Sequence, residues 1–247
     1  FHHDTSRALD PQLPTHVVIS NMDQGADGKF RALHNDKIHE QMMAVGQFYR
    51  NALAINLERL GYETETDEKG LVQIAGMNAE VMSRFSKRRE EIKAALNERG
   101  MSPDHKNSAL ATLATRASKK PVERAELAKA WADEVKDLGL DPKTLLDGMR
   151  DLSRVQTTHS NLSPRDLTTR AVGFAIAHIS ERASVYSHSD VMLTALKYDK
   201  AVDPAIAEQV LAERLSEKEL YAVTRKGELH YTDKLNVQLE TDNVRMM

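Results

Sequence analysis

The sequence predicts an α+β fold: a short antiparallel sheet with long helices, followed by a small helical module. Residues 15–21, "THVVISN", form a β-branched run between Pro14 and a turn-rich stretch, which is typical of a strand. From Asn35 onward, apolar residues recur at three- and four-residue steps, the spacing of an amphipathic helix. Two alternating runs around a Lys-Gly turn near the C-terminus indicate a hairpin that follows helices.

The composition is that of a globular protein without a strong overall charge. The 247 residues are 40% apolar, enough for one large domain or two modest ones. A net charge of −3 gives no overall basic field, so any nucleic acid would have to bind a local patch. The chain has no cysteine, which excludes disulfides, thiolate zinc sites and cysteine nucleophiles. His, Asp and Glu are left as metal ligands.

The sequence contains no apolar run of about 18 residues and no leader pattern. We therefore expect a cytoplasmic protein without membrane insertion. The chain starts at Phe1, inside a patterned segment, so we also expect its N-terminus to have been cut from a longer chain.

The first 160 residues are expected to combine short strands with long helices. Residues 1–5 are a candidate partner strand for 15–21. Further elements then follow along the chain: a helix at 35–60 before Gly61, a strand at 71–76, a helix at 79–98, a helical start at 102–120, a helix from Pro121 to Gly139, and a short helix at 141–152.

The polar segment "SRVQTTHSNLSPRD" lacks periodicity and predicts a linker. We therefore expect two domains, 1–160 and 161–247. The second has helical patterns near 165–182, 188–198 and 203–215, followed by the hairpin "ELYAVTRKGELHYT". Three helices followed by a hairpin form a winged-helix-like order.

The N-terminal histidines are candidate metal ligands, but strand geometry limits how many can act together. Alternate residues of a strand share a face, so His16 shares a face with Pro14. If the two strands pair, either His2 or His3 lies opposite His16, but not both, because neighbours face opposite ways. The pattern predicts two imidazoles at most. Two histidines without a third ligand bind metal weakly, and ordinary strand-edge histidines fit the pattern as well.

The same segment resembles a known family. "FHHDTSRALDPQLPTHVVISN" closely resembles the metal-binding strand pair of conjugative relaxases of the relaxase–helicase type (MobF-type, HUH endonucleases), in which "DTSR" is followed by "PQLHTH". Later stretches are similar too, among them "GKFRALHNDKIHEQ", "LERLGYETE", "IAGMNAEVMSRFSKRREEI" and "WADEVKDLGLDP". The resemblance covers nearly the whole chain. It implies an incomplete HUH-relaxase antiparallel sheet, followed by the module at the start of the helicase region.

The resemblance also implies a reaction and its ligands. Family relaxases nick one strand at a plasmid transfer origin: a tyrosine attacks the scissile phosphate, which a divalent ion held by three histidines polarises. Matching positions make His3 and His16 the first and third ligands. The second position is Pro14, which has no lone pair to give. Water can fill such a vacancy around Mg²⁺ or Mn²⁺, so we expect a weakened divalent metal site.

The family's catalytic tyrosines lie upstream of "HDTSR", where this chain begins. None of the six tyrosines of this sequence matches the nucleophile, and core packing or helix-face anchoring is their expected role. We therefore expect that the chain as given does not nick DNA.

Contacts with single-stranded transfer-origin DNA are the function expected to survive. By resemblance, Arg7 in "DTSR" lies near the bound strand, and Arg50 in "FYRNAL" matches a helix position that helps to choose the sequence. Arg116, Lys119 and Lys120 of "TRASKK" are candidate phosphate contacts. Lys87, Arg88 and Arg89 are weaker candidates, because Glu90 and Glu91 follow them and mixed-charge helix faces are commonly just solvated.

Two functional interpretations remain open beside a chance resemblance in an unrelated α+β protein. The first is part of a conjugative relaxase, whose partners are transfer-origin DNA and other relaxosome or conjugation proteins. The second is a non-enzymatic DNA-binding module or degenerate relaxase remnant, whose metal site decayed at Pro14.

Overall fold

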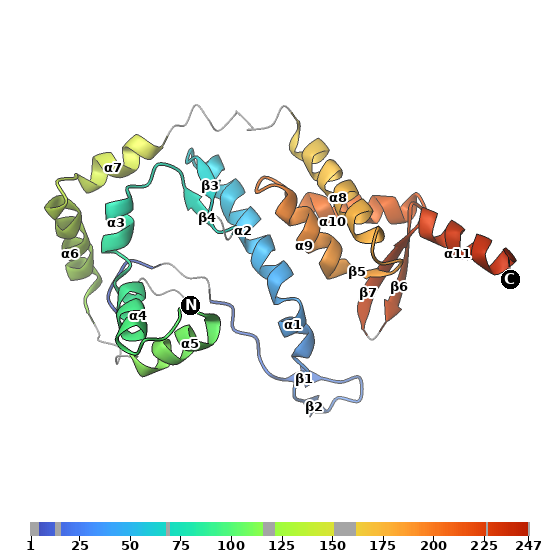
Figure 1. The fold of residues 1–247 in the computed structure, drawn as a ribbon, viewed down its shortest axis with the longest axis horizontal. Helices are drawn as coiled ribbons and strands as arrows, with labels where there is room; N and C mark the ends of the chain where they lie inside the picture. Colours follow the sequence, from blue (N-terminus) through green and yellow to red (C-terminus); the bar gives the residue numbers. More distant parts are fainter. Residues whose placement is uncertain are drawn as a thin grey trace. The chain divides into compact units, whose positions relative to one another are not determined.

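The computed structural model describes residues 5–12, 16–67, 70–115, 122–150, 162–225 and 227–246, without the side chains of His105 and Leu146 (Figure 1). These residues form helices and small antiparallel sheets, which confirms the mixed α and β class. They divide into two compact units. The first unit comprises Phe1–Leu33 and Gly76–Met149, and the second comprises His34–Ala75 and Arg150–Met247.

The first unit is mainly helical. It contains a two-stranded antiparallel sheet of β1 (Asp23–Gln24) and β2 (Phe30–Arg31), and the helices α3 (Ala79–Arg84), α4 (Lys87–Glu98), α5 (His105–Ala114), α6 (Arg124–Asp137) and α7 (Pro142–Met149). Asn78 and Asp104 cap α3 and α5, because their side chains accept hydrogen bonds from backbone N–H groups of the first turn. The strand predicted at 71–76 is confirmed as β4 of the second unit.

The predicted helix at 79–98 is wrong in one respect, because it is two helices. Phe85 and Ser86 separate α3 from α4, and the Ser86 hydroxyl donates a hydrogen bond of 2.6 Å to the Met82 carbonyl. Such a side-chain bond competes with the helical backbone bonds. The predicted helix at 35–60 is likewise divided, at Gln41.

The strand predicted at 15–21 is absent from its described part, residues 16–21. Val17 and Val18 are each 78% exposed there, and no neighbouring strand supplies hydrogen bonds to this segment within the described residues. A β-branched run needs such a partner to form a stable strand. Thr5 forms an isolated bridge with Pro11 instead of pairing with 15–21. The rest of the predicted strand pair, residues 1–4 and 13–15, lies outside the described residues.

The second unit brings together segments that are distant in the sequence. Its elements are α1 (Asp36–Glu40), α2 (Met42–Arg59), β3 (Thr64–Thr66), β4 (Val72–Ile74), α8 (Pro164–Ser180), β5 (Tyr186–Ser187), α9 (His188–Tyr198), α10 (Pro204–Ser216), β6 (Leu220–Arg225), β7 (Glu228–Asp233) and α11 (Lys234–Met246). β3 pairs with β4, and a three-stranded antiparallel sheet has the order β5-β7-β6. Figure 1 shows this sheet at the ends of α8, α9 and α10.

The main hydrophobic core lies between α8, α9, α10 and this sheet. Its most buried members include Val172, Val191 and Leu211, each at most 1% exposed. The helix starts are set by side chains: Ser163 caps α8, Asp203 caps α10, and Ser187 forms a capping box with Asp190 at α9. The sequence pattern of three helices and a hairpin is therefore present, with a short extra strand, β5, between the first two helices.

The division into domains at residue 160 remains a prediction. The compact units do not follow a single cut in the sequence, because His34–Ala75 groups with the C-terminal half. The reason lies in α2, which packs on α9 and contributes the buried Gln47, Asn51 and Ala54.

Candidate nucleic-acid interface

The predicted metal ligands are only partly within the described residues. His3 and Pro14 lie outside them, and His16 has an exposed side chain. Among the described residues, no group of three His, Asp or Glu side chains is placed to hold a metal ion. The two-histidine site therefore stays a prediction.

Arg7 belongs to a tight turn in the first unit. The Ser6 hydroxyl accepts hydrogen bonds from the backbone N–H groups of Ala8 (3.2 Å) and Asp10 (3.1 Å). Leu9 takes a left-handed conformation, with φ of 62°. Arg7 and its neighbours line a recess of about 390 Å³ together with Arg88 and residues of α5. The turn thus places one predicted DNA contact beside a second basic residue.

Arg88 has a structural task that the sequence did not reveal. Its guanidinium donates hydrogen bonds to the carbonyl oxygens of Thr112 (2.7 Å) and Thr115 (2.9 Å), at the C-terminal end of α5, and it also pairs with Glu91 (2.9 Å). A cation is favourable at a helix C-terminus, where carbonyl groups lack helical partners. Arg88 therefore joins α4 to α5 and is only 19% exposed.

The first unit also contains a buried carboxylate, Asp10, that the sequence did not predict. The Lys87 ammonium lies 2.7 Å from Glu134 of α6 and 3.6 Å from Asp10. Asp10 is 3% exposed, and its Oδ1 accepts no hydrogen bond within the described residues. Only the sequence "DPQ" after the turn could have hinted at Asp10, because partners so distant in the chain leave no local pattern. Lys87 is thus an internal counter-ion and not a free phosphate contact.

Arg50 lies on α2 in the second unit and lines a larger recess, of about 590 Å³. The recess is formed by α2, the β3–β4 hairpin and the C-terminal end of α9. Other residues that line it include Met43, Gln47, Lys197, Tyr198 and Lys200. Arg50 is half-buried and donates a hydrogen bond of 3.0 Å to the Gln47 Oε1 atom.

Lys200 is fixed at the edge of this recess. Its ammonium donates to Glu58 (2.7 Å) and to the hydroxyl (2.8 Å) and the carbonyl oxygen of Thr64. The side chain is 20% exposed, so the pair is largely sheltered from solvent screening. Lys200 therefore fastens α9 and the following turn to α2 and β3.

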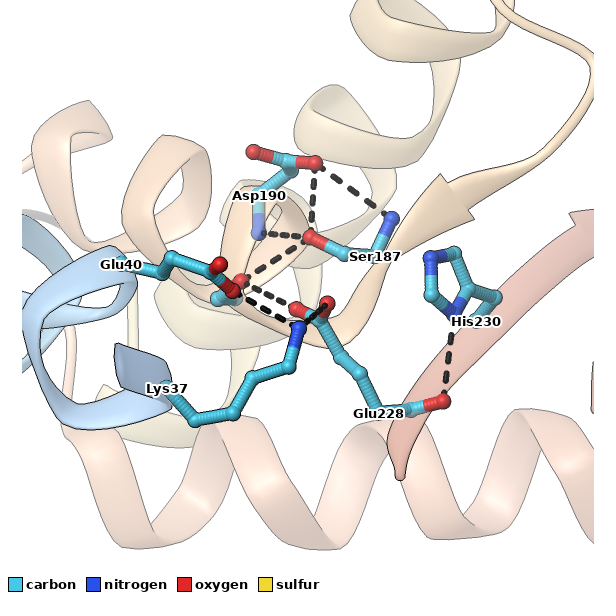
Figure 2. A network of polar contacts seen from close by, with 7 residues as sticks. Lys37, Glu40, Ser187, Asp190, Glu228 and His230 are labelled. Atoms are coloured by element: carbon cyan, nitrogen blue, oxygen red, sulfur yellow. Dashed lines mark hydrogen bonds and ion pairs between the residues drawn. The ribbon is translucent and has the colours of Figure 1, made fainter. Parts of the chain in front are cut away.

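A polar network connects α1 with the C-terminal hairpin (Figure 2). The Lys37 ammonium lies 2.7 Å from Glu40 and 3.6 Å from Glu228, and the Ser189 hydroxyl donates to Glu228 (3.0 Å). Figure 2 shows Lys37 pointing between these two carboxylates. The hydrogen bond to Glu40, and then the Glu40 and Glu228 charges, raise the pKa of Lys37. Lys37 thus anchors α1 within the second unit.

Two of the six tyrosines are core residues, as expected. Tyr186 is 3% exposed and Tyr231 is 2% exposed, and burial raises the pKa of both phenols, that of Tyr231 to about 12. A raised pKa keeps the phenol protonated near neutral pH, which is the opposite of what an activated nucleophile requires. Arg116, Lys119 and Lys120 lie outside the described residues.

Comparison with known proteins gives one consistent result. The sequence model of the family described as "TrwC relaxase" matches residues 1–138. Over 96% of its length the chain is 30% identical to the Escherichia coli "Multifunctional conjugation protein TraI", and it spans 14% of that relative's length. A second Escherichia coli protein of the same name is 29% identical over the same shares.

Solved structures agree with the sequence relatives. The chain is similar to "Conjugative Relaxase TrwC in complex with OriT Dna" in a metal-free and a metal-bound form, each at 38% identity with a TM-score of 0.53. These likenesses cover 57% of this chain and 51% and 50% of the two solved chains. A third similar structure is of TrwC with a 27-mer DNA comprising the recognition hairpin and the cleavage site, at the same identity.

No helix in the described part of the chain is long and apolar enough to cross a membrane.

Proposed function

Because this chain belongs to the TrwC relaxase family, we propose that it is the DNA-contacting part of a conjugative relaxase that nicks single-stranded transfer-origin DNA. The single observation that carries the proposal is the family match over residues 1–138, which includes Arg7, Arg50 and both candidate histidines. The solved relaxase in complex with transfer-origin DNA supports the same partner. The chain spans 14% of the length of its curated relatives, so the activities of those whole proteins are not carried over to it.

The donor set at the metal position fits a weak divalent site. His3 and His16 would hold the ion, and Pro14 offers no donor at the position of a second histidine. When bound, the ion supplies Lewis-acid stabilisation of charge on the scissile phosphate. That a relative was solved in metal-bound and metal-free forms is consistent with a divalent ion that is not needed for folding.

Arg7 and Arg50 are proposed to contact different parts of the DNA. Arg7, beside the recess of the first unit, contacts the phosphate backbone, and Arg50, on α2, contacts a base edge. Arg116, Lys119 and Lys120 add phosphate contacts. Because Arg88 and Lys87 are held by internal partners, they are left out of the proposed interface.

A test of nicking follows from the tyrosines. The nucleophile of the family has no match in this sequence, so the chain incubated with a single-stranded transfer-origin oligonucleotide and Mg²⁺ or Mn²⁺ is expected to bind without forming an adduct. The measurement is a denaturing gel that separates free DNA from a covalent protein–DNA species. An adduct formed by the wild-type chain and lost on chelation contradicts the proposed inactivity and supports an enzyme.

The alternative, a degenerate non-enzymatic DNA-binding remnant, is favoured by Pro14 alone. Pro14→His separates the two. In a chain that carries the tyrosine-bearing segment of the family upstream of Phe1, a damaged enzyme regains metal-dependent nicking with this substitution, because a third imidazole completes the ligand set. A degenerate remnant shows no nicking even with this substitution. Thr15→His is the matched control, since in the predicted strand the side chains of residues 14 and 15 face opposite ways.

The C-terminal module is proposed to be winged-helix-like and to bind protein, not duplex DNA. The order α8, β5, α9, α10, β6 and β7, with the sheet order β5-β7-β6, supports the first part. The surface of α10 supports the second: Glu208 pairs with His188, Glu213 pairs with Arg165, and Arg214 pairs with Glu219. The basic side chain that α10 itself carries is thus already paired and offers no strong phosphate contact. Other relaxosome or conjugation proteins are its proposed partners.

A further inference from the structure

A chain of hydrogen bonds runs from α9 to Arg50. The NH₂ group of Asn51, which is fully buried on α2, lies within hydrogen-bond distance of three carbonyl oxygens around the end of α9, so that its two N–H bonds are shared among them: Leu196 (3.0 Å), Asp199 (3.0 Å) and Val202 (3.1 Å). The Asn51 Oδ1 atom accepts from Gln47 Nε2 at 2.9 Å. The Gln47 Oε1 atom in turn accepts from Arg50 Nη1 at 3.0 Å.

The chemistry of the two side-chain amides fixes which atom donates and which accepts in each of these hydrogen bonds. Three carbonyl acceptors require the NH₂ group of Asn51, because a carbonyl oxygen there would face only acceptors. Asn51 must therefore present its oxygen to Gln47, which fixes the NH₂ group of Gln47 on that side. The oxygen of Gln47 is left for the guanidinium, which only donates. The backbone at the end of α9 thus dictates which atom Arg50 meets.

The neighbours of Arg50 leave its hydrogen bond to Gln47 undisturbed. Gly46 precedes it by one helical turn, and a Cβ atom there would lie 3.7 Å from Arg50 Nη2, in van der Waals contact. Lys200, at the end of the same recess, is bound to Glu58 and Thr64 and does not compete for Gln47. Since Gln47 is 8% exposed, water has little access to the bond that holds Arg50.

We propose that the turn at 196–202 orients Arg50 for the reading of single-stranded DNA, with Asn51 and Gln47 as positioning residues. The inference rests on the proposed function, in which Arg50 contacts a base edge. The hydrogen bond to Gln47 holds the Arg50 side chain in one rotamer before DNA binds. Less side-chain entropy is therefore lost when the remaining N–H groups of the guanidinium contact a base. The C-terminal module, which supplies the turn, thereby takes part in sequence discrimination without touching DNA.

The test uses the full chain and a randomised pool of single-stranded oligonucleotides. The sequence most enriched by the wild-type chain and a shuffled version of it are then the two probes. Arg50→Ala is expected to lower the ratio of their affinities by roughly tenfold, as for a lost arginine–base contact. Gln47→Leu is expected to lower it by about threefold, because Arg50 remains but loses one hydrogen bond that orients it. Affinity for the shuffled probe stays within about twofold, since phosphate contacts are unchanged.

A second readout follows Arg50 without DNA. Side-chain NMR of the arginine Nε–H group is expected to show an ordered Arg50 in the wild-type chain and a mobile one in Gln47→Leu and Asn51→Leu. Asn56→Leu is the matched control, because Asn56 lies on the same helix but is exposed, and its side-chain amide donates to the Ala52 carbonyl of that helix. If Asn51→Leu fails to fold, Gln47→Leu carries the test, since it leaves the Asn51 anchor intact.

The outcomes separate the inference from the function beneath it. If the wild-type chain enriches a sequence and Arg50→Ala loses the preference, but Gln47→Leu behaves as wild type in both readouts, the positioning role is overturned and the DNA function stands. If the wild-type chain enriches no sequence, the readout function fails and this inference fails with it. A preference shifted by Gln47→Leu, with a mobile Arg50, supports both.

Discussion

The C-terminal module and the helices of the first unit bury their apolar residues to different extents. The module has one contiguous core, in which residues such as Val172 and Leu211 are almost completely excluded from solvent. The described part of the first unit buries five separate apolar side chains: Val81, Leu96, Ala111, Leu127 and Val135. It also contains a charged cluster in which Asp10 is buried, while its partner Lys87 and the neighbouring Glu134 are partly exposed. The difference teaches that stability is concentrated in the module, whereas Arg7 and His16, two of the predicted site residues, lie in the less packed unit.

The largest expected effect comes from core leucines. Leu211→Ala in α10 is expected to lower the free energy of unfolding by about 4 kcal/mol, because it empties a site that is 1% exposed in a continuous core. Leu127→Ala in α6 is expected to cost about 2 kcal/mol. Urea unfolding measures both, and Leu235→Ala, at a position 65% exposed, is the control with no loss. Equal losses at 211 and 127 would remove the contrast between the two regions.

An effect of intermediate size is the pH dependence of stability that the buried Tyr231 gives to the module. Burial raises the pKa of Tyr231 from 10.0 to about 12, so the unfolded chain releases this proton at a lower pH than the folded chain does. The contribution of Tyr231 to the free energy of unfolding is therefore expected to fall by about 2 kcal/mol as the pH rises from about 10 to about 12, and to stay constant below that range. Tyr186, whose pKa is also raised by burial, adds a loss of its own over the same range. Denaturant titrations across this range measure the slope.

Tyr231→Phe provides the control for that slope. It is expected to lower stability at neutral pH, because the phenol oxygen lies 2.8 Å from His188 Nδ1, and to reduce the alkaline loss to the part that Tyr186 contributes. Tyr221→Phe, at an exposed position, leaves the slope as in the wild type. An unchanged slope in Tyr231→Phe would show that Tyr231 is not the group responsible.

The smallest expected effect tests the interaction of Lys87 with Asp10 and Glu134 in the first unit. Lys87→Met keeps most of the side-chain stem but removes the charge near Asp10 and Glu134, so stability is expected to fall by about 1 kcal/mol. Lys93→Met on the same helix is the matched control, since Lys93 and its partner Glu90 are both about half exposed and such pairs contribute little. Thermal melts compare the two variants. A loss as large for Lys93→Met as for Lys87→Met contradicts an internal role of Lys87.

Local patterns explain how much of the fold the sequence predicted. Helices with a side-chain cap and an apolar stripe, such as α8 after Ser163 and α10 after Asp203, were placed within a few residues, because both signals are local. The sequence did not predict the break at Gln41, and the strand that it predicted at 15–21 is absent from residues 16–21. They depend on which partners a segment finds, and a β-branched run without a neighbour has no hydrogen bonds to complete it.

The candidate site was predicted by resemblance more than by pattern. Arg7 and Arg50 were named from motifs, and the structure shows each beside a recess. Asn51 was missed, because an asparagine in a helix carries no sign of the carbonyl groups that it meets about 150 residues later. The sequence offered Arg88 only as a weak DNA contact or a solvated side chain, because its carbonyl partners on α5 are likewise distant in the chain. Long-range polar contacts leave no periodic trace in a sequence.

One contact in the first unit has a practical use. Trp131 is the only tryptophan of the chain, and its indole N–H donates a hydrogen bond of 2.8 Å to the carbonyl oxygen of Leu9. This carbonyl belongs to the turn that carries Arg7. Indole emission responds to the polarity and hydrogen bonding around the ring, so the chain contains its own fluorescent reporter of that turn. The proposed binding of a DNA strand at Arg7 is therefore expected to change the emission of the unlabelled protein.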